Sequence, residues 1–268
     1  MLPIGGAASA PIASRATLTR VRAESRQFYV WMAYACAFVA IAGFTPTYWA
    51  PVATGSFVGP PILHVHGLLF SAWMLLFIAQ ARFAASGRFE YHRSLGLVGI
   101  SLATAMLFAG LMVAITSIND GSARGFEQQT RAFSIVPITI ILFFAATVAA
   151  AIANTRRPDV HMRLMLVASI SLLPPAIARI FFVFLAPAGS PRPGLGEPPA
   201  VVFSLLPSFA SDLLLVVAMA NDWRTRGRPH PTYLMTGALM LALQIVRVPF
   251  SGTPAWRAVT DWLLALAG

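Results

Sequence analysis

Three histidines recur at equal spacing along the chain and have the chemistry of metal ligands. His92, His161 and His230 are 69 residues apart, and each stands at the start of a long apolar segment. Imidazole nitrogens commonly ligate zinc, copper, iron and haem iron. If the three segments are neighbours, the imidazoles converge at one depth and could hold a transition metal or haem b. The alternative is that they are ordinary polar residues of interfacial turns.

The turns that carry these histidines share a short pattern. Arg-x-acid-x-His ends at His92 and at His161, whereas Arg228 replaces the acid two residues before His230. One helical hairpin fits into each interval, which favours a parallel repetition of hairpin units. Small residues after His92, such as Gly96 and Gly99, would give a porphyrin a flat wall or let helices pack closely.

A polar stripe runs along one apolar segment. His66, Trp73 and Gln80 are separated by seven residues each, so they share one helix face. Polar side chains within a membrane must face protein or a cavity, because lipid offers them no hydrogen-bond partner. The stripe therefore indicates either the wall of a cofactor or quinone pocket or the packed interior of a bundle.

Charged residues interrupt three other apolar segments. Arg179, Asp212 and Arg247 each cost about 2.5–3.5 kcal/mol in hydrocarbon on insertion scales. We therefore expect Asp212 to pair with Arg179, with Arg247 or with both, and Gln244 to join this polar network. The set is either a structural ion pair, a site for an anion, or part of a transport pathway.

Seven helices must position these residues. The chain is 57% hydrophobic and only 10% charged, against about 25% charged in soluble domains. Seven apolar segments are each near the ~20 residues that cross a bilayer. The sequence thus predicts an all-α, polytopic bundle of seven transmembrane helices, over residues 28–49, 63–83, 94–118, 132–154, 162–187, 201–220 and 232–250.

The flanking regions and the arginines complete the expected topology. We expect a mobile basic tail over 1–27, the transmembrane domain over 28–250, and an interfacial amphipathic tail over 251–268. All 19 basic residues are arginine, and most lie in turns on the side of the N-terminus. The positive-inside rule then places the N-terminus in the cytoplasm and the C-terminus outside. Despite the net charge of +10, arginines between apolar segments favour lipid headgroups over nucleic acid as partners.

The sequence also resembles a group of bacterial multi-pass membrane proteins that share a domain of unknown function. The resemblance covers roughly residues 63–170 and rests on His64-x-His66-Gly67, Gln80, the turn His92-Arg93-x-x-Gly96 and the helix start His161-x-x-Leu164-Met165. It implies a similar helical fold in the bacterial inner membrane and implies no activity. More distantly, histidines at helix ends are similar to those of transmembrane b-type cytochromes, which move electrons through bis-histidine haems. The match is incomplete, and this sequence supports at most one inner haem, ligated by two of His92, His161 and His230.

Three functions stay open at this point. The first is a redox protein in which the inner histidines bind haem b or a metal, with Arg93, Arg163 or Arg179 neutralising anionic groups. The second is an accessory subunit that binds lipid and other membrane subunits, or its own copies. The third is a transporter that uses the Arg179, Asp212 and Arg247 layer. Sequence motifs of serine hydrolases, nucleotide-binding loops and Cys-x-x-Cys redox sites are absent, so enzymatic activity is left open.

Overall fold

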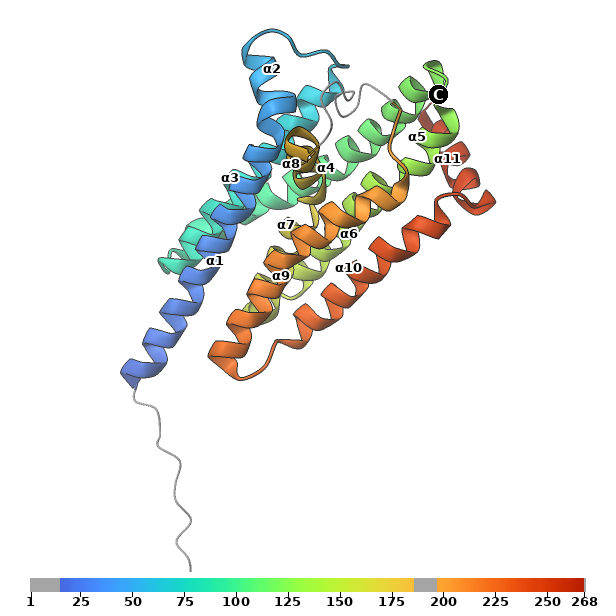
Figure 1. Cartoon of the computed structure of the whole chain (residues 1–268). Helices are drawn as coiled ribbons and strands as arrows, with labels where there is room; N and C mark the ends of the chain where they lie inside the picture. The colour runs from blue at the N-terminus through green and yellow to red at the C-terminus, as the bar shows by residue number, and fades with distance from the viewer. Residues whose placement is uncertain (1–14, 186–196, 268) are drawn as a thin grey trace, which may run out of the picture.

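The structure is a computed structural model that describes residues 15–185 and 197–267. All regular elements in these ranges are helical, as the sequence predicts (Figure 1). They are α1 Arg15–Phe44, the π-helical turn η1 Thr45–Trp49, α2 Ala50–Ala53, α3 Ile62–Ala85, α4 Phe89–Ala123, α5 Glu127–Phe133, α6 Ile135–Ala153, α7 Pro158–Ser171, α8 Pro174–Leu185, the 3-10 turn η2 Val201–Ser204, α9 Leu205–Arg226, α10 Pro231–Phe250 and α11 Pro254–Ala267.

The seven predicted spans are confirmed among the described residues. Seven helical segments are long and apolar enough to cross a membrane: Arg26–Ala53, Ile62–Ala85, Phe89–Ala123, Glu127–Ala153, Pro158–Leu185, Val201–Arg226 and Pro231–Phe250.

Several of these spans extend past their predicted ends. The third begins at Phe89 rather than 94, and the sixth continues to Arg226 rather than 220. Most of the added residues are polar, so hydropathy does not count them as part of the span. They are still helical, because the backbone hydrogen bonds of the helix continue until the chain turns. Gly227, with φ of 76°, is the turn that ends α9.

Five helices form a closed ring around the main core. Contacts join α1 to α3, α3 to α4, α4 to α6, α6 to α7, and α7 back to α1. Fully buried side chains fill the centre, among them Trp73, Met106, Phe144 and Leu166. Helices α9 and α10 pack outside this ring against α7, α8 and α6. The ring therefore brings the ends of consecutive hairpins close together.

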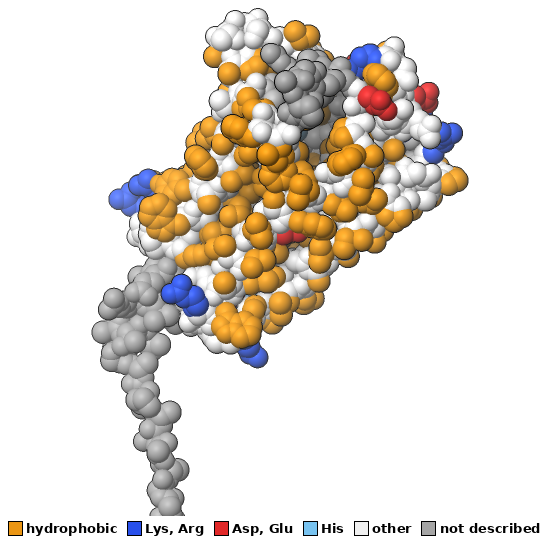
Figure 2. Space-filling model, viewed as in Figure 1, with side chains coloured by type: hydrophobic (Ala, Val, Ile, Leu, Met, Phe, Trp, Pro, Cys, Tyr) orange, Lys and Arg blue, Asp and Glu red, His pale blue; other side chains and the backbone are white. Residues whose placement is uncertain are grey.

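The surface is that of a multi-pass membrane protein. Large apolar side chains such as Phe184 and Leu213 are exposed by 77% and 62%. Apolar side chains cover most of the middle of the face seen in Figure 2, whereas arginines lie toward its ends. Lipid, not water, suits such a surface. We call the end with the α3–α4, α6–α7 and α9–α10 turns the inner end, because the sequence predicts that it faces the cytoplasm.

Helix α1 begins at one end of the bundle, and α11 lies at the other (Figure 1). Helix α1 begins at Arg15, so part of the predicted tail is helical, and residues 1–14 lie outside the described residues. Helix α11 forms as predicted and is held by Trp256, whose Nε1–H donates to the Arg131 carbonyl at 2.8 Å. Arg131 also binds Asp261 of α11 at 2.6 Å.

Candidate functional site

Two of the three inner histidines lie close together. His92 and His161 are each the fourth residue of their helix, α4 and α7. Their ring centres are 6.3 Å apart, and the ring planes are inclined by 83°. The ring of helices thus brings together two imidazoles that are 69 residues apart in the sequence.

Each of these imidazoles is anchored in the same way. Nδ1 of His92 donates to the carbonyl of Gln80 at 3.2 Å, and Nδ1 of His161 donates to the carbonyl of Ala151 at 2.8 Å. A carbonyl only accepts, so both Nδ1 atoms carry a proton, which in a neutral imidazole leaves the lone pair on Nε2. This is the tautomer and the anchoring found in metal-binding histidines.

His230 does not join the pair. Its Nδ1 accepts from the backbone N–H of Thr232 at 3.1 Å, and its Nε2 lies 3.1 Å from Oδ2 of Asp159. Because both nitrogens are engaged, the lone pair needed for a metal is already in use. No group of three metal-ligating side chains lies within 15–185 and 197–267. The expected convergence of three histidines is therefore not found.

The hydrogen bonds of His230 make its helix cap sensitive to pH. Burial lowers the pKa of His230 below its ordinary value, as do the charges of Arg163 and Arg226, while the bond to Asp159 opposes them. Since the unfolded chain binds this proton more readily, the stabilisation is present above about pH 6.5 and is lost as the pH falls through the lowered pKa.

We therefore predict that part of the acid sensitivity of the melting temperature comes from His230. The variant His230→Asn keeps a capping oxygen but does not titrate. Melting curves between neutral and mildly acidic pH should be steeper in wild type than in this variant. Equal pH slopes in the two proteins would contradict the assignment.

Arg163 has a structural partner that the sequence analysis missed. Its Nε and Nη2 donate to the two carboxylate oxygens of Asp222 at 2.9 and 2.6 Å, and both side chains are 2% exposed. Its Nη1 donates to the Asp159 carbonyl at 2.6 Å. The charge of Arg163 is thus balanced within the protein. Our expectation that Arg163 neutralises an anionic group of a cofactor is therefore wrong. Arg93 lies exposed on α4.

The predicted polar stripe divides into three different surroundings. Trp73 is core: its Nε1–H donates to Ser169 Oγ at 3.2 Å and its ring packs edge-on against Phe144. Gln80 lies beside the histidine pair, and its Oε1 is buried without a partner. His66 stacks on Phe70 at 4.0 Å between ring centres, with Nδ1 also buried and unpartnered. One helix face therefore serves the core and two distinct polar sites.

The structure shows no direct ion pair of Asp212 with an arginine among the described residues, although Asp212 and Arg247 still attract each other across the α9–α10 contact. Asp212 Oδ1 instead accepts from Gln244 Nε2 at 3.2 Å. Arg247 donates from Nη2 to Ser208 Oγ at 2.7 Å and to the Ser204 carbonyl at 3.2 Å. The reason is the antiparallel register of α9 and α10, which sets Gln244 level with Asp212 and Arg247 one turn further out, level with Ser208.

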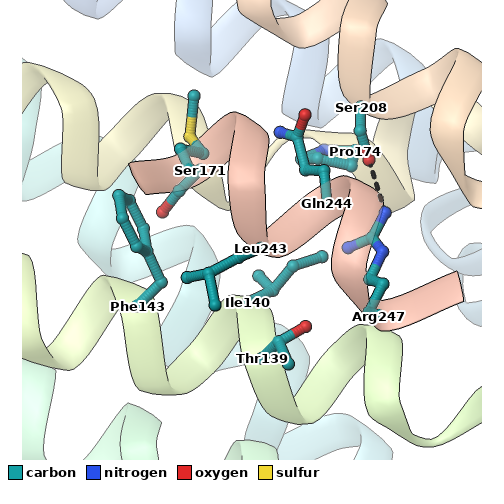
Figure 3. A pocket seen from close by; sticks show the side chains of 10 residues that line it. Thr139, Ile140, Phe143, Ser171, Pro174, Ser208, Leu243, Gln244 and Arg247 are labelled. Atoms are coloured by element: carbon teal, nitrogen blue, oxygen red, sulfur yellow. Dashed lines mark hydrogen bonds between the residues drawn. The ribbon is translucent and has the colours of Figure 1, made fainter. Parts of the chain in front are cut away.

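A small cavity lies beside this polar cluster. Its volume is about 20 Å³, and the side chains that line it include Thr139, Ser171 and Gln244 (Figure 3). That is room for about one water molecule. Gln244 Oε1 and Arg247 Nε are buried without partners. The cavity also adjoins the break between α7 and α8, where Pro174 interrupts the span.

Arg179 lies apart from this cluster. Its Nη1 donates to the Pro175 carbonyl at 2.9 Å, and its guanidinium carbon is 4.4 Å from the centre of the Phe44 ring. Its Nε is buried and unpartnered, and it makes no ion pair within the described ranges. The predicted layer of three charges is thus two separate sites.

Comparisons with known proteins found no match for this chain. No family model, curated protein or solved structure matches the chain significantly. The resemblance to the bacterial membrane proteins and to b-type cytochromes stays a prediction.

Proposed function

We propose that the protein is a redox protein of the bacterial inner membrane that binds a transition metal between His92 and His161, either as a bare ion or as haem iron. The observation that carries this proposal is the close pair of anchored imidazoles, 6.3 Å apart between ring centres. Metal–nitrogen bonds to histidine are about 2.0–2.1 Å, so two imidazoles on opposite sides of one ion have ring centres about 6 Å apart. The spacing suits one shared ion.

The donor set supports a redox metal. Two neutral imidazoles suit copper, iron and haem iron, and two protein ligands leave further coordination positions for porphyrin nitrogens or other donors. The bound metal would supply one-electron transfer. The backbone carbonyls of Gln80 and Ala151 would hold the two rings in place, and Gln80 Oε1 offers a further acceptor at the site.

An absorption spectrum of the detergent-purified protein tests the proposal, taken oxidised and then reduced with dithionite, with metal analysis of the same sample. A Soret band with α/β bands that sharpen on reduction would identify haem b. One equivalent of metal without a Soret band would identify a bare ion. A featureless spectrum without stoichiometric metal, from cells supplied with haem and iron, would overturn the proposal.

A second candidate function is transport of a small polar solute, and a specific observation favours it. A binding site next to a broken transmembrane helix is the arrangement that many transporters use. Here the cavity lined by Ser171 and Arg247 adjoins the α7–α8 break. We predict that Ser171→Cys, in a Cys36→Ala background, reacts with a small water-soluble thiol reagent in membranes.

The matched control is Ala168→Cys, one turn away on α7 and fully buried in the core. It should stay unreactive because it is buried in the core and does not line this cavity. If both cysteines resist the reagent, the cavity is closed to water and the transport hypothesis fails.

A further inference from the structure

We infer that the outer end of the bundle holds a binding site for a phosphate group, of a lipid headgroup or as free phosphate, formed by Thr47, His66 and Arg179. This inference is independent of the metal proposed between His92 and His161, which are at the opposite end of the bundle.

Three segments that are far apart in the sequence meet at this site. Thr47 belongs to η1, His66 to the first turns of α3, and Arg179 to α8. Arg179 stacks on Phe44, the residue directly before η1. Gly43 permits this approach, because a Cβ there would run into the backbone of Ala176 on α8.

The contact between η1 and α3 completes the site. Gly67 has no side chain, and Tyr48 of η1 packs against it, so η1 lies directly over the helix face next to His66. The hydroxyl of Tyr48 also lies 3.1 Å from Nδ1 of His64. His66 is in turn within electrostatic reach of Arg179. The π-helical turn itself is a rare conformation that is frequent at functional sites.

Hydrogen-bonding capacity remains unused at this site. Six buried side-chain polar atoms of the described residues have no hydrogen-bond partner, and three of them are Thr47 Oγ1, His66 Nδ1 and Arg179 Nε. Each of the three groups can donate a hydrogen bond. Buried donors without partners are rare in proteins, and each of them needs an acceptor.

The charge of the site indicates that the acceptor is an anion. Arg163 is neutralised by Asp222, and Arg131 by Glu127 and Asp261. By contrast, no acidic group of the described residues acts on Arg179 or on His66. Among the described residues the Arg179 guanidinium has a carbonyl and an aromatic ring as its partners, so no carboxylate there balances its charge. An anion would balance this charge in a region that lipid surrounds.

A phosphate group fits these donors best. It offers several acceptor oxygens to donors that approach from three directions, and arginine recognises it strongly. The site is also at headgroup depth, since Tyr48 and the exposed Trp49 are the aromatic residues typical of a membrane interface. The phosphate of a lipid would therefore reach Arg179 while it stays in the headgroup layer of the membrane.

The test is phosphate retention by the full-length protein. Native mass spectrometry and phosphorus analysis of detergent-purified protein should show about one tightly held phospholipid. Arg179→Gln should weaken retention by about 10- to 100-fold, the loss expected for a charge-assisted hydrogen bond. Arg179→Lys should restore part of it. Arg247→Gln, which removes another buried arginine of the outer half, should retain the lipid.

A second measurement separates the two sources of phosphate. The melting temperature of delipidated protein is measured in nanodiscs of phosphatidylglycerol or phosphatidylcholine, and in detergent with inorganic phosphate. Stabilisation by a phospholipid that Arg179→Gln abolishes indicates a lipid headgroup, and equal stabilisation by inorganic phosphate indicates a free anion. If Arg179→Gln does not fold, Thr47→Val and His66→Gln are used in the same assays.

The inference is overturned if lipid content and phosphate-dependent stabilisation are the same in wild type and in these variants. Bound metal and the absorption spectrum serve as an independent readout. They should be unchanged in Arg179→Gln, so a failure here is distinguishable from a failure of the proposed redox function.

Discussion

Replacing Asp222 with asparagine is expected to destabilise the protein by about 3–5 kcal/mol. The carboxylate is almost fully buried and binds both Nε and Nη2 of Arg163. Asparagine keeps the shape but removes the charge, so the guanidinium of Arg163 stays buried without a counter-ion. A buried uncompensated charge is among the largest single penalties that a substitution can cause.

The position of the pair adds to this effect, because it connects three helices. Asp222 of α9 holds Arg163 of α7 and also accepts the backbone N–H of His230 at 3.1 Å, just before α10. The guanidinium of Arg163 lies 5.5 Å from the centre of the Tyr233 ring, and the Tyr233 hydroxyl is hydrogen-bonded to that of Tyr29 on α1. Loss of the carboxylate would loosen the inner ends of all these helices together.

Denaturant unfolding in detergent, followed by circular dichroism, measures this loss. Asp261→Asn is the matched control, because it breaks an ion pair with Arg131 in which the carboxylate is 58% exposed. Exposed pairs contribute only about 0–1 kcal/mol. The double variant Arg163→Met with Asp222→Leu should recover much of the stability, since it leaves no buried charge. Similar losses in Asp222→Asn and Asp261→Asn would contradict the assigned role.

The sequence could predict the spans but not this pair, for a physical reason. Hydropathy reports where lipid surrounds the chain, and by that criterion the sixth span ends near 220. Asp222 lies beyond this point, among polar residues that are typical of a turn. The helix nevertheless continues to Arg226. One signal in the sequence could have indicated the partner. Asp222 lies just past the sixth apolar segment, and Arg163 lies in the fifth.

The charges within the spans show a similar limit. Their cost in lipid correctly predicts that Arg247 and Gln244 are buried in protein, at 3% and 5% exposure. It does not predict their partners, which depend on the axial register of α9 against α10. A shift of one helical turn would have set Arg247 level with Asp212 instead of Ser208. Register follows from side-chain packing of both helices, and one sequence does not reveal it.

The equal spacing of the histidines was informative for two of them. His92 and His161 lie in the first turn of a helix, whereas His230 lies one residue before α10 begins. Proline at the first position of a helix marks this difference in the sequence. Pro158 precedes His161 by three residues, whereas Pro231 directly follows His230. The three histidines are thus equally spaced in the sequence, but His230 takes a different position relative to the start of its helix.

This difference leads to the prediction with the largest effect on the proposed function. His92→Ala and His161→Ala should each abolish metal binding, because either change removes one of two protein ligands from a shared ion. His230→Asn, which alters the third histidine of the series, should keep the full metal content and spectrum. Its ring nitrogens are engaged with Thr232 and Asp159, not with a ligand.

Two measurements make this series decisive. Metal content and the reduced-minus-oxidised spectrum are compared in all three variants, after circular dichroism confirms that each is folded. Added imidazole should restore the spectrum to His92→Ala and His161→Ala, because a free ligand can occupy the space left by the ring. If a wild-type spectrum persists in His92→Ala or His161→Ala, or disappears in His230→Asn, the metal is bound elsewhere. If imidazole restores nothing although the variants are folded, the histidines support the site without ligating the metal.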